Sequence, residues 1–300
     1  MKVSVFFVIV DTFMFNKDFA ALEIRLAELY SVVDLFVICE SRYTHSGKRK
    51  KLYLTENLDL YSKYADKIKI IIDNRRHFTR NARIREMQQR NCISKFLSKI
   101  PILDGDFVIH SDCDEIPRAS TLISELNSNN CNLLFELDNY VNYLNLYAGK
   151  WRRIRVVSGN NFKSVVRMKQ DIFLFSDFEK RRHKFPFIRV PVFWTHRKFF
   201  LWKIPQFIQE KPNLKLVENG GWHFNNLFDA EEIISKIESS SHTEMNTEEI
   251  KIAAIDRFKQ GREIYTGEKY KMVEIDDSFP TIVYKNISKW SKFVFTQKND

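Results

Sequence analysis

Two carboxylates that stand two residues apart, Asp112 and Asp114, are the strongest chemical signal in this 300-residue sequence. They follow the apolar run 107–110, which is typical of a buried strand. Side chains alternate along an extended chain, so both carboxylates point to one side. Such a pair offers hard oxygen ligands to Mn²⁺ or Mg²⁺, and a cation there can neutralise a diphosphate leaving group. A capped turn before a helix explains the same residues, because Pro117 suits a first helical turn.

Three further residues could bind the nucleotide part of a ligand. Glu40 ends the apolar run 34–40, where a carboxylate can accept hydrogen bonds from a ribose or a base, or simply close a turn. Arg83 and Arg90 lie in a predicted helix, and a guanidinium there can bind a diphosphate in bidentate fashion. Arg90 also stands four residues after Glu86, which is the spacing of an ordinary surface ion pair.

The segment Gly220-Gly221-Trp222-His223 is the second local signal. Paired glycines let a backbone approach a ligand closely. Trp222 offers a flat apolar face to a sugar ring, and His223 offers a nitrogen to a metal ion or a hydrogen bond. A lone histidine is more often structural, so the sequence leaves both roles open.

The elements that must position these residues alternate between strand and helix in the first half of the chain. Strands are predicted at 3–10, 34–40, 67–73 and 107–110, and helices at 16–30 and 81–100. This alternation predicts an α/β fold with a largely parallel twisted sheet flanked by helices. Ligands bind past the carboxyl ends of such strands, which is where Glu40 and Asp112 fall.

The second half is more aromatic and ends in helices. We expect several strands within 132–167, an aromatic and basic segment at 188–202, and helices at 231–239 and 247–261, the last with a capping box from Asn246 to Glu249. The expected organisation is one domain over residues 1–287, with a nucleotide-binding half (1–118) and an acceptor half (119–287). A loosely held basic tail (288–300) follows.

Composition limits the class of protein. A hydrophobic content of 44% indicates a globular chain, and the net charge of +10 favours an anionic partner. The basic residues are dispersed and no nucleic-acid motif accompanies them, so we expect no nucleic-acid partner. Four scattered cysteines suggest reduced, buried thiols. No apolar run approaches the roughly 20 residues of a membrane-spanning helix, so we expect a cytoplasmic protein with peripheral contact to anionic membrane.

Several blocks of the sequence together resemble glycosyltransferase family 17, the family of β-1,4-mannosyl-glycoprotein 4-β-N-acetylglucosaminyltransferase. The blocks are Phe15-Asn16, Leu22-Glu23-Ile24-Arg25, Glu28-Leu29, Val33-Asp34, Phe36-Val37-Ile38-Cys39-Glu40-Ser41, Ser111 to Pro117, and Gly221-Trp222-His223. The resemblance spans about residues 3–265. Within the family, the sequence is similar to the anchorless bacterial or viral members. The membrane anchor and stalk of the animal enzymes are not found in it, and residues 135–215 differ from the animal sequences.

The resemblance implies a GT-A-like fold and an inverting transfer from a UDP-sugar, UDP-GlcNAc in the animal enzymes, to a saccharide or glycoconjugate acceptor. Asp112 and Asp114 match the family's metal–diphosphate motif, and Glu115 matches the acidic residue that follows it. Glu40, Arg90, Trp222 and His223 match further positions.

The mechanism expected on this basis is a single displacement that depends on Mn²⁺ or Mg²⁺. Asp112, Asp114 and His223 are the expected metal ligands, and Glu40, Arg83, Arg90, Asp112 and Trp222 are expected to bind the nucleotide sugar. The general base is expected to be Glu115 or, second, Asp138, which follows the apolar run 133–137. Two other classes stay open: a metal-dependent sugar nucleotidyltransferase and a non-catalytic basic binding protein.

Overall fold

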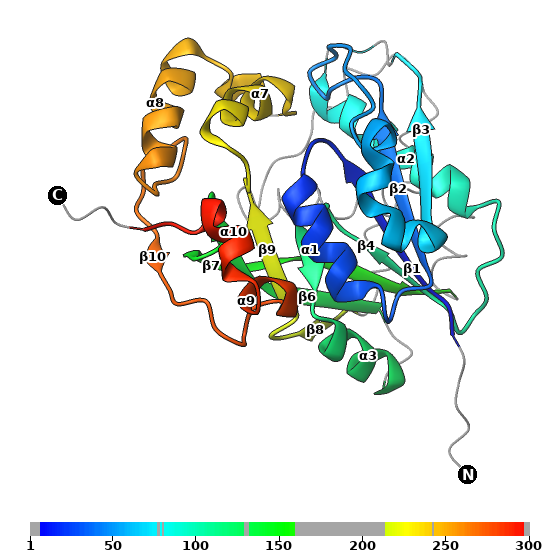
Figure 1. Cartoon of the computed structure of the whole chain (residues 1–300). Coiled ribbons are helices and arrows are strands. Elements are labelled where there is room, and N and C mark those ends of the chain that lie inside the picture. Colours follow the sequence, from blue (N-terminus) through cyan, green and yellow to red (C-terminus); the bar gives the residue numbers. More distant parts are fainter. Residues whose placement is uncertain are drawn as a thin grey trace, which may run out of the picture.

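One large mixed sheet runs through both halves of the chain (Figure 1). The computed structural model describes residues 7–76, 79, 81–128, 132–159, 214–241 and 243–296. Within that part the strand order is β3-β2-β1-β4-β7-β6-β9-β5, with β10 beside β7 and β8 beside β6. The predicted aromatic and basic segment at 188–202 lies outside the described residues.

The amino-terminal half is the alternating unit that the sequence predicts. Its strands β3, β2, β1 and β4 pair in parallel. The bounds are β1 Ile9–Phe15, α1 Phe19–Leu29, β2 Leu35–Ser41, η1 Thr55–Lys67, β3 Ile68–Asp73, α2 Ala82–Leu97 and β4 Phe107–His110. The first strand was predicted at 3–10 but ends later, at Phe15, because the charged side chain of Asp11 ends the apolar run without ending the strand. Asp11 is instead a buried strand residue, paired with Arg25.

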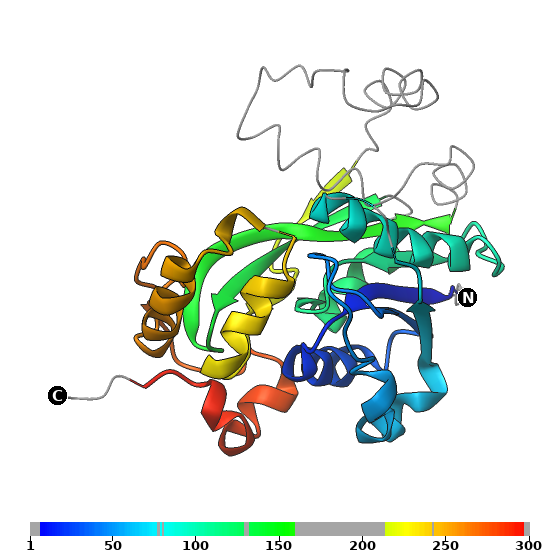
Figure 2. The same cartoon turned by 90° about the horizontal axis from the view of Figure 1, so that it is seen from above.

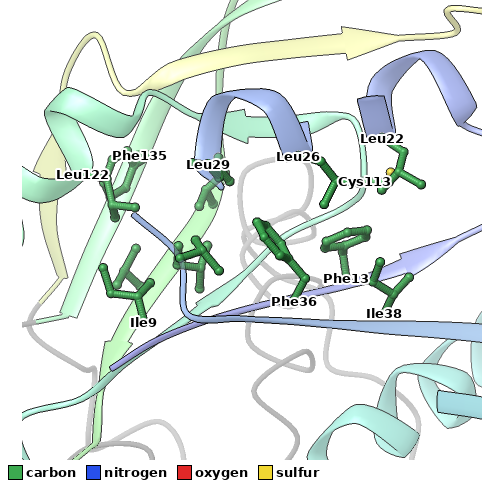
Figure 3. Close-up of a cluster of buried hydrophobic side chains, with 14 of the residues drawn as sticks. Ile9, Phe13, Leu22, Leu26, Leu29, Phe36, Ile38, Cys113, Leu122 and Phe135 are labelled. Carbon is green, nitrogen blue, oxygen red and sulfur yellow. The ribbon is translucent and has the colours of Figure 1, made fainter. Parts of the chain in front are cut away.

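Helices cover both faces of these parallel strands, as the alternation of buried side chains requires. On one face Ile9 and Phe13 belong to a cluster with α1 (Figure 3). On the other face Val10 and Val37 pack with residues of α2. Figure 2 shows α1 and α2 on opposite sides of β1. The predicted α/β fold, with a mostly parallel sheet and flanking helices, is confirmed.

The second half continues the same sheet with a different pattern. Strand β7 runs antiparallel to β4 and to β6, and β9 runs parallel to β6 and antiparallel to β5. The bounds are β5 Glu115–Pro117, α3 Ala119–Ser128, β6 Asn132–Val141, β7 Leu146–Ser158, β8 Leu214–Val217, β9 Gly221–Asn225, α7 Ala230–Ser239, η3 Thr243–Met245 and α8 Glu248–Lys259. The cap of α8 is one residue later than predicted: the Thr247 hydroxyl, not Asn246, accepts the amide of Ile250.

The end of the chain is packed, up to the last described residue. Its elements are β10 Lys271–Met272, α9 Thr281–Tyr284, α10 Ile287–Trp290 and η4 Ser291–Phe293. Trp290 and Phe293 are buried in a cluster that includes Ile24 of α1 and Phe224 of β9. The expectation of a loosely held tail is therefore wrong for 288–296, because its aromatic residues bury apolar area in the core. None of the described helices is long and apolar enough to cross a membrane.

Candidate functional site

The side chain of Asp112 lies just past the carboxyl end of β4 and is held by α2. Arg90 donates to Asp112 Oδ1 at 2.5 Å and to Glu86 Oε1 at 2.9 Å, so the predicted 86–90 pair and a contact with Asp112 coexist. Burial alone would raise the pKa of Asp112, but the guanidinium outweighs it and lowers that pKa to about 2. Asp112 is therefore a carboxylate at any physiological pH, and Arg90 fixes its direction.

A buried arginine from α1 organises the backbone of the same loop. Arg25 forms a bidentate ion pair with Asp11 of β1, at 2.6 and 2.8 Å. Its Nη1 also donates to the carbonyl oxygens of Asp112 and Glu115, at 2.9 and 2.7 Å. Because both ionic side chains are fully buried, this pair locks the path of residues 112–115 relative to β1 and α1.

Asp114 meets His223 at the centre of the site. The two come from the loop after β4 and from β9, and Asp114 Oδ2 lies 3.6 Å from His223 Nε2. Burial disfavours the charged ring, yet the neighbouring Asp114 outweighs it, so the pKa of His223 is raised. The same contact lowers the pKa of Asp114 although burial would raise it. These two predicted metal ligands are thus brought together.

Glu115 lies beside this pair and is fixed at both oxygens. Oε1 accepts from the Trp151 indole at 2.7 Å, and Oε2 accepts from the Asp112 amide at 2.9 Å. Burial, followed by the charge of Asp112, raises the pKa of Glu115. The Trp151 ring also stacks on His223, with 4.8 Å between centroids. Trp151 therefore positions both residues.

Strand register separates the predicted residues onto two faces of the sheet. Glu115 and Asn139 are both register partners of His223, so these three share one face. Trp222 and its partner Asp138 share the other face, because adjacent residues of a strand point oppositely. The structure therefore does not bring Trp222 or Asp138 to the Asp114 site.

Trp222 and Asp138 have other partners on that opposite face. Trp222 is 2% exposed within the core, and its indole donates to the carbonyl of Ser278. Asp138 pairs with Lys150 at 2.7 Å. The expected sugar-stacking role of Trp222 is thus replaced by core packing. The glycines before it serve the sheet, since a Cβ at Gly221 would lie 2.1 Å from the carbonyl oxygen of Ile116 in β5.

Two further predicted residues are held by partners other than Asp114 and His223. Glu40 is fully buried, and its carboxylate accepts from the amides of Leu54 and Thr55 and from the Thr55 hydroxyl. It anchors the start of η1 instead of presenting oxygens to a ribose. Arg83 is half-exposed and pairs with Glu244 at 3.2 Å, about two helical turns from Arg90.

Asp18 and Lys236 extend the site towards α7. They form a 3.5 Å ion pair between the start of α1 and α7. Burial raises the pKa of Asp18 to about 6, despite the opposing effect of Lys236. The charges of Asp114 and Asp112 raise it further, which shows that the carboxylates gather in one place.

Asp114 and His223 could bind a divalent cation whose remaining ligands come from the substrate. No cluster of three or more His, Cys, Asp or Glu in the described ranges is arranged to hold a metal by itself. The 3.6 Å between Asp114 Oδ2 and His223 Nε2 suits two ligands that share one ion at about 2.1 Å each. Mg²⁺-like ions commonly use one or two protein ligands, with substrate phosphates and water as the rest. Asp112 faces Arg90 instead.

The sequence profile of glycosyltransferase family 17 matches residues 4–177, more than half of the chain. The chain belongs to glycosyltransferase family 17. The matched part carries Arg25, Arg90, Asp112 to Glu115 and Trp151, whereas His223 and Lys236 lie beyond it. The family predicted from the sequence blocks is therefore confirmed.

Comparison with other proteins adds little beyond the family. No curated protein sequence matches this chain significantly. A solved structure described as GalNAc-T7 with UDP, GalNAc and Mn²⁺ is similar over 53% of this chain, at 11% identity and a TM-score of 0.33. The match covers 36% of that protein, so this chain corresponds to little more than a third of its length.

Sequence reasoning missed several residues that build the site. Trp151, Asn139, Asp18 and Lys236 carry no local motif, and Arg25, although it lies in one of the matching blocks, was assigned no role. Arg25 alone had a signal, an arginine within an otherwise apolar helix face, which indicates a buried charge with a partner. The others are brought in by strand pairing and by the packing of α7, neither of which has a local sequence signature.

Proposed function

We propose that this protein is a transferase that moves a sugar, GlcNAc by analogy with the family, from a UDP-sugar to a saccharide acceptor. The observation that carries the proposal is the convergence of Asp114 and His223, 3.6 Å apart, beside the Arg90–Asp112 pair at the carboxyl end of β4. That arrangement supplies a carboxylate ligand, an imidazole ligand and a guanidinium where a parallel sheet binds nucleotides. Membership of glycosyltransferase family 17 supports the reaction type.

In this proposal Asp114 and His223 hold Mn²⁺ or Mg²⁺. When bound, the cation neutralises negative charge on the departing diphosphate. Arg90 holds the carboxylate of Asp112. The Asp112 side chain is still 45% exposed and can accept a hydrogen bond from the nucleotide sugar. Asn139 Oδ1 and His223 Nδ1 are buried atoms without a hydrogen-bond partner among the described residues. We propose that they meet hydroxyl groups of a bound sugar, since buried polar atoms are seldom left unpaired.

Glu115 is the proposed general base. It adjoins Asp112 and Asp114 in the chain, and its two accepted hydrogen bonds leave lone pairs free. Its carboxylate would take the proton from an acceptor hydroxyl as that oxygen attacks the anomeric carbon and UDP leaves, which inverts the configuration. Asp138 is set aside because its ion pair with Lys150 lies on the other face of the sheet.

The test is turnover of a panel of UDP-sugars with Mn²⁺, with released UDP as the product measured. Asp114→Asn should fold and lose at least about a hundredfold in rate, since charge stabilisation at the leaving group is a large part of catalysis. Asp59→Asn, an exposed aspartate of η1, is the matched control and should keep full activity. Release of pyrophosphate from a nucleoside triphosphate, or an active Asp114→Asn in EDTA, would contradict the proposal.

The nucleotide is tested separately by thermal unfolding with UDP, GDP and CMP, each with Mn²⁺. A ligand at 100 times its Kd stabilises the folded state by about 2.7 kcal/mol. UDP should give the largest shift in Tm. A larger shift with GDP or CMP would overturn the UDP assignment, whereas faster turnover of UDP-glucose than of UDP-GlcNAc would change only the sugar.

A further inference from the structure

A narrow pocket adjoins the site on the side of α7, and two lysines without carboxylate partners line it. Its walls come from the end of β1, the loop after β2 and α7, which lie side by side in Figures 1 and 2. The residues used below are Lys17, Lys50, Tyr53, Ser235 and Lys236, all of which line it. None of the functional residues predicted from the sequence lies in this pocket.

Lys50 is the unusual residue of this pocket. Its ammonium nitrogen is buried and has no hydrogen-bond partner among the described residues. It faces the Tyr53 ring, 5.1 Å from the centroid, which offers weak cation–π attraction in place of a counter-ion. Burial lowers the pKa of Lys50, and the charge of Glu40 opposes that only in part. An ammonium in such surroundings is destabilising unless an anion meets it.

Lys17 brings a second ammonium to the same ring. Its Nζ lies 5.0 Å from the Tyr53 centroid and donates to the Ser235 hydroxyl at 3.3 Å. No carboxylate lies within ion-pair distance of Lys17 or Lys50 in the described part of the chain. Lys17 is also held in the left-handed region, with φ of 67°, which directs the backbone at the end of β1.

Lys236 links the pocket to the Asp114 site. This lysine lines the pocket and pairs with Asp18, the residue next to Lys17. Its charge also acts on Asp114, where it helps to lower the pKa. Two cations without ion-paired carboxylates therefore line a pocket that shares Lys236 with the surroundings of Asp114.

We infer that Lys17 and Lys50 form a phosphate subsite, which binds the diphosphate of a nucleoside diphosphate whose other contact is at Asp114. The inference rests on the proposed function, because it assigns part of the same ligand. An ammonium is a compact donor that suits a phosphate oxygen, and two of them over one ring balance two negative charges. The same ligand would give Lys50 the counter-ion that the free chain does not provide.

The test is calorimetric binding of UDP, uridine and pyrophosphate to wild-type protein, Lys50→Met and Lys17→Met, with thermal unfolding to confirm folding. Methionine keeps the apolar stem and removes the charge. Each variant should bind UDP at least tenfold more weakly, about 1.4 kcal/mol, and uridine within twofold of wild type. Lys63→Met is the matched control: Lys63 is an exposed lysine 4.6 Å from the Tyr64 ring, and its loss should change nothing.

The outcomes separate the two claims. Unchanged UDP affinity in both pocket variants, or equal weakening for UDP and uridine, overturns the phosphate subsite and leaves the proposed function intact. Wild-type protein that binds pyrophosphate through Lys50 but no UDP supports the anion subsite and contradicts the UDP-sugar function. Wild-type protein that binds neither UDP nor pyrophosphate contradicts both.

Discussion

At the scale of single residues, the two tryptophans near His223 have opposite roles. Trp151 donates to Glu115 and stacks on His223, whereas Trp222 donates to the carbonyl of Ser278 on the other face of the sheet. Both lose one indole hydrogen bond when replaced by phenylalanine, so the same substitution can separate a positioning role from a structural one.

We predict that Trp151→Phe lowers kcat at least tenfold, because it leaves Glu115 Oε1 without its donor. The free energy of unfolding of the Trp151→Phe variant should fall by only about 1–3 kcal/mol, the usual cost of leaving a buried polar group without a hydrogen bond. Trp222→Phe should lose a similar amount of stability with kcat unchanged. The measurements are steady-state kinetics and urea unfolding, and equal loss of kcat in both variants would refute the assignment.

At the scale of elements, Arg25 connects α1 to β1 and to the loop after β4. Through this residue α1 sets the position of the Asp112–Glu115 backbone. The ion pair with Asp11 is fully buried, so water cannot solvate the Asp11 carboxylate when Arg25 is removed.

We predict that Arg25→Met destabilises the fold by about 3–5 kcal/mol, because it leaves the Asp11 carboxylate buried and unpaired. Lys289→Met is the control, since it removes the partially exposed ion pair between Lys289 of α10 and Glu23 of α1 and should cost less than about 1 kcal/mol. Urea unfolding gives both values. A cost for Arg25→Met no larger than the control would show that the buried pair does not hold the loop.

The sequence predicted elements better than it predicted which residues meet. Strand β4 was located without error and α2 nearly so, because apolar runs and helical periodicity are local signals. Asp114 and His223, predicted as ligands, do meet. Trp222 was expected in the site because it follows paired glycines, and Asp138 because it follows an apolar run. Whether a strand residue faces the site, however, depends on which strand it pairs with and in which register. Strand pairing is set by residues that are distant in the sequence, and a local sequence pattern carries no information about them.

At the scale of the whole molecule, the carboxyl-terminal residues close the core around the first helix. Trp290 and Phe293 share a cluster with Ile24 of α1 and Phe224 of β9, so the end of the chain packs with a helix of the first half and a strand of the second. We therefore propose that the described chain, up to residue 296, unfolds as one cooperative unit.

We predict that Trp290→Ala destabilises the protein by about 3–5 kcal/mol and that unfolding stays a single transition. Lys292→Ala, two residues on and 60% exposed, is the control and should have little effect. Calorimetry and near-UV circular dichroism give the transitions. Two separate transitions, or a harmless Trp290→Ala, would contradict cooperative closure by the terminal segment.

Adjacent side chains of β9 point to opposite faces of the sheet, which limits where insertions and deletions can occur in this protein. Inserting or deleting a single residue before His223 would exchange the faces of the strand, with Trp222 towards Asp114 and the histidine inside the apolar cluster. Substitutions in β9 alter one property at a time, but such an indel would damage the binding centre and the interior together. Homologues should therefore vary in length on either side of β9 and keep the distance from Gly221 to Asn225 constant.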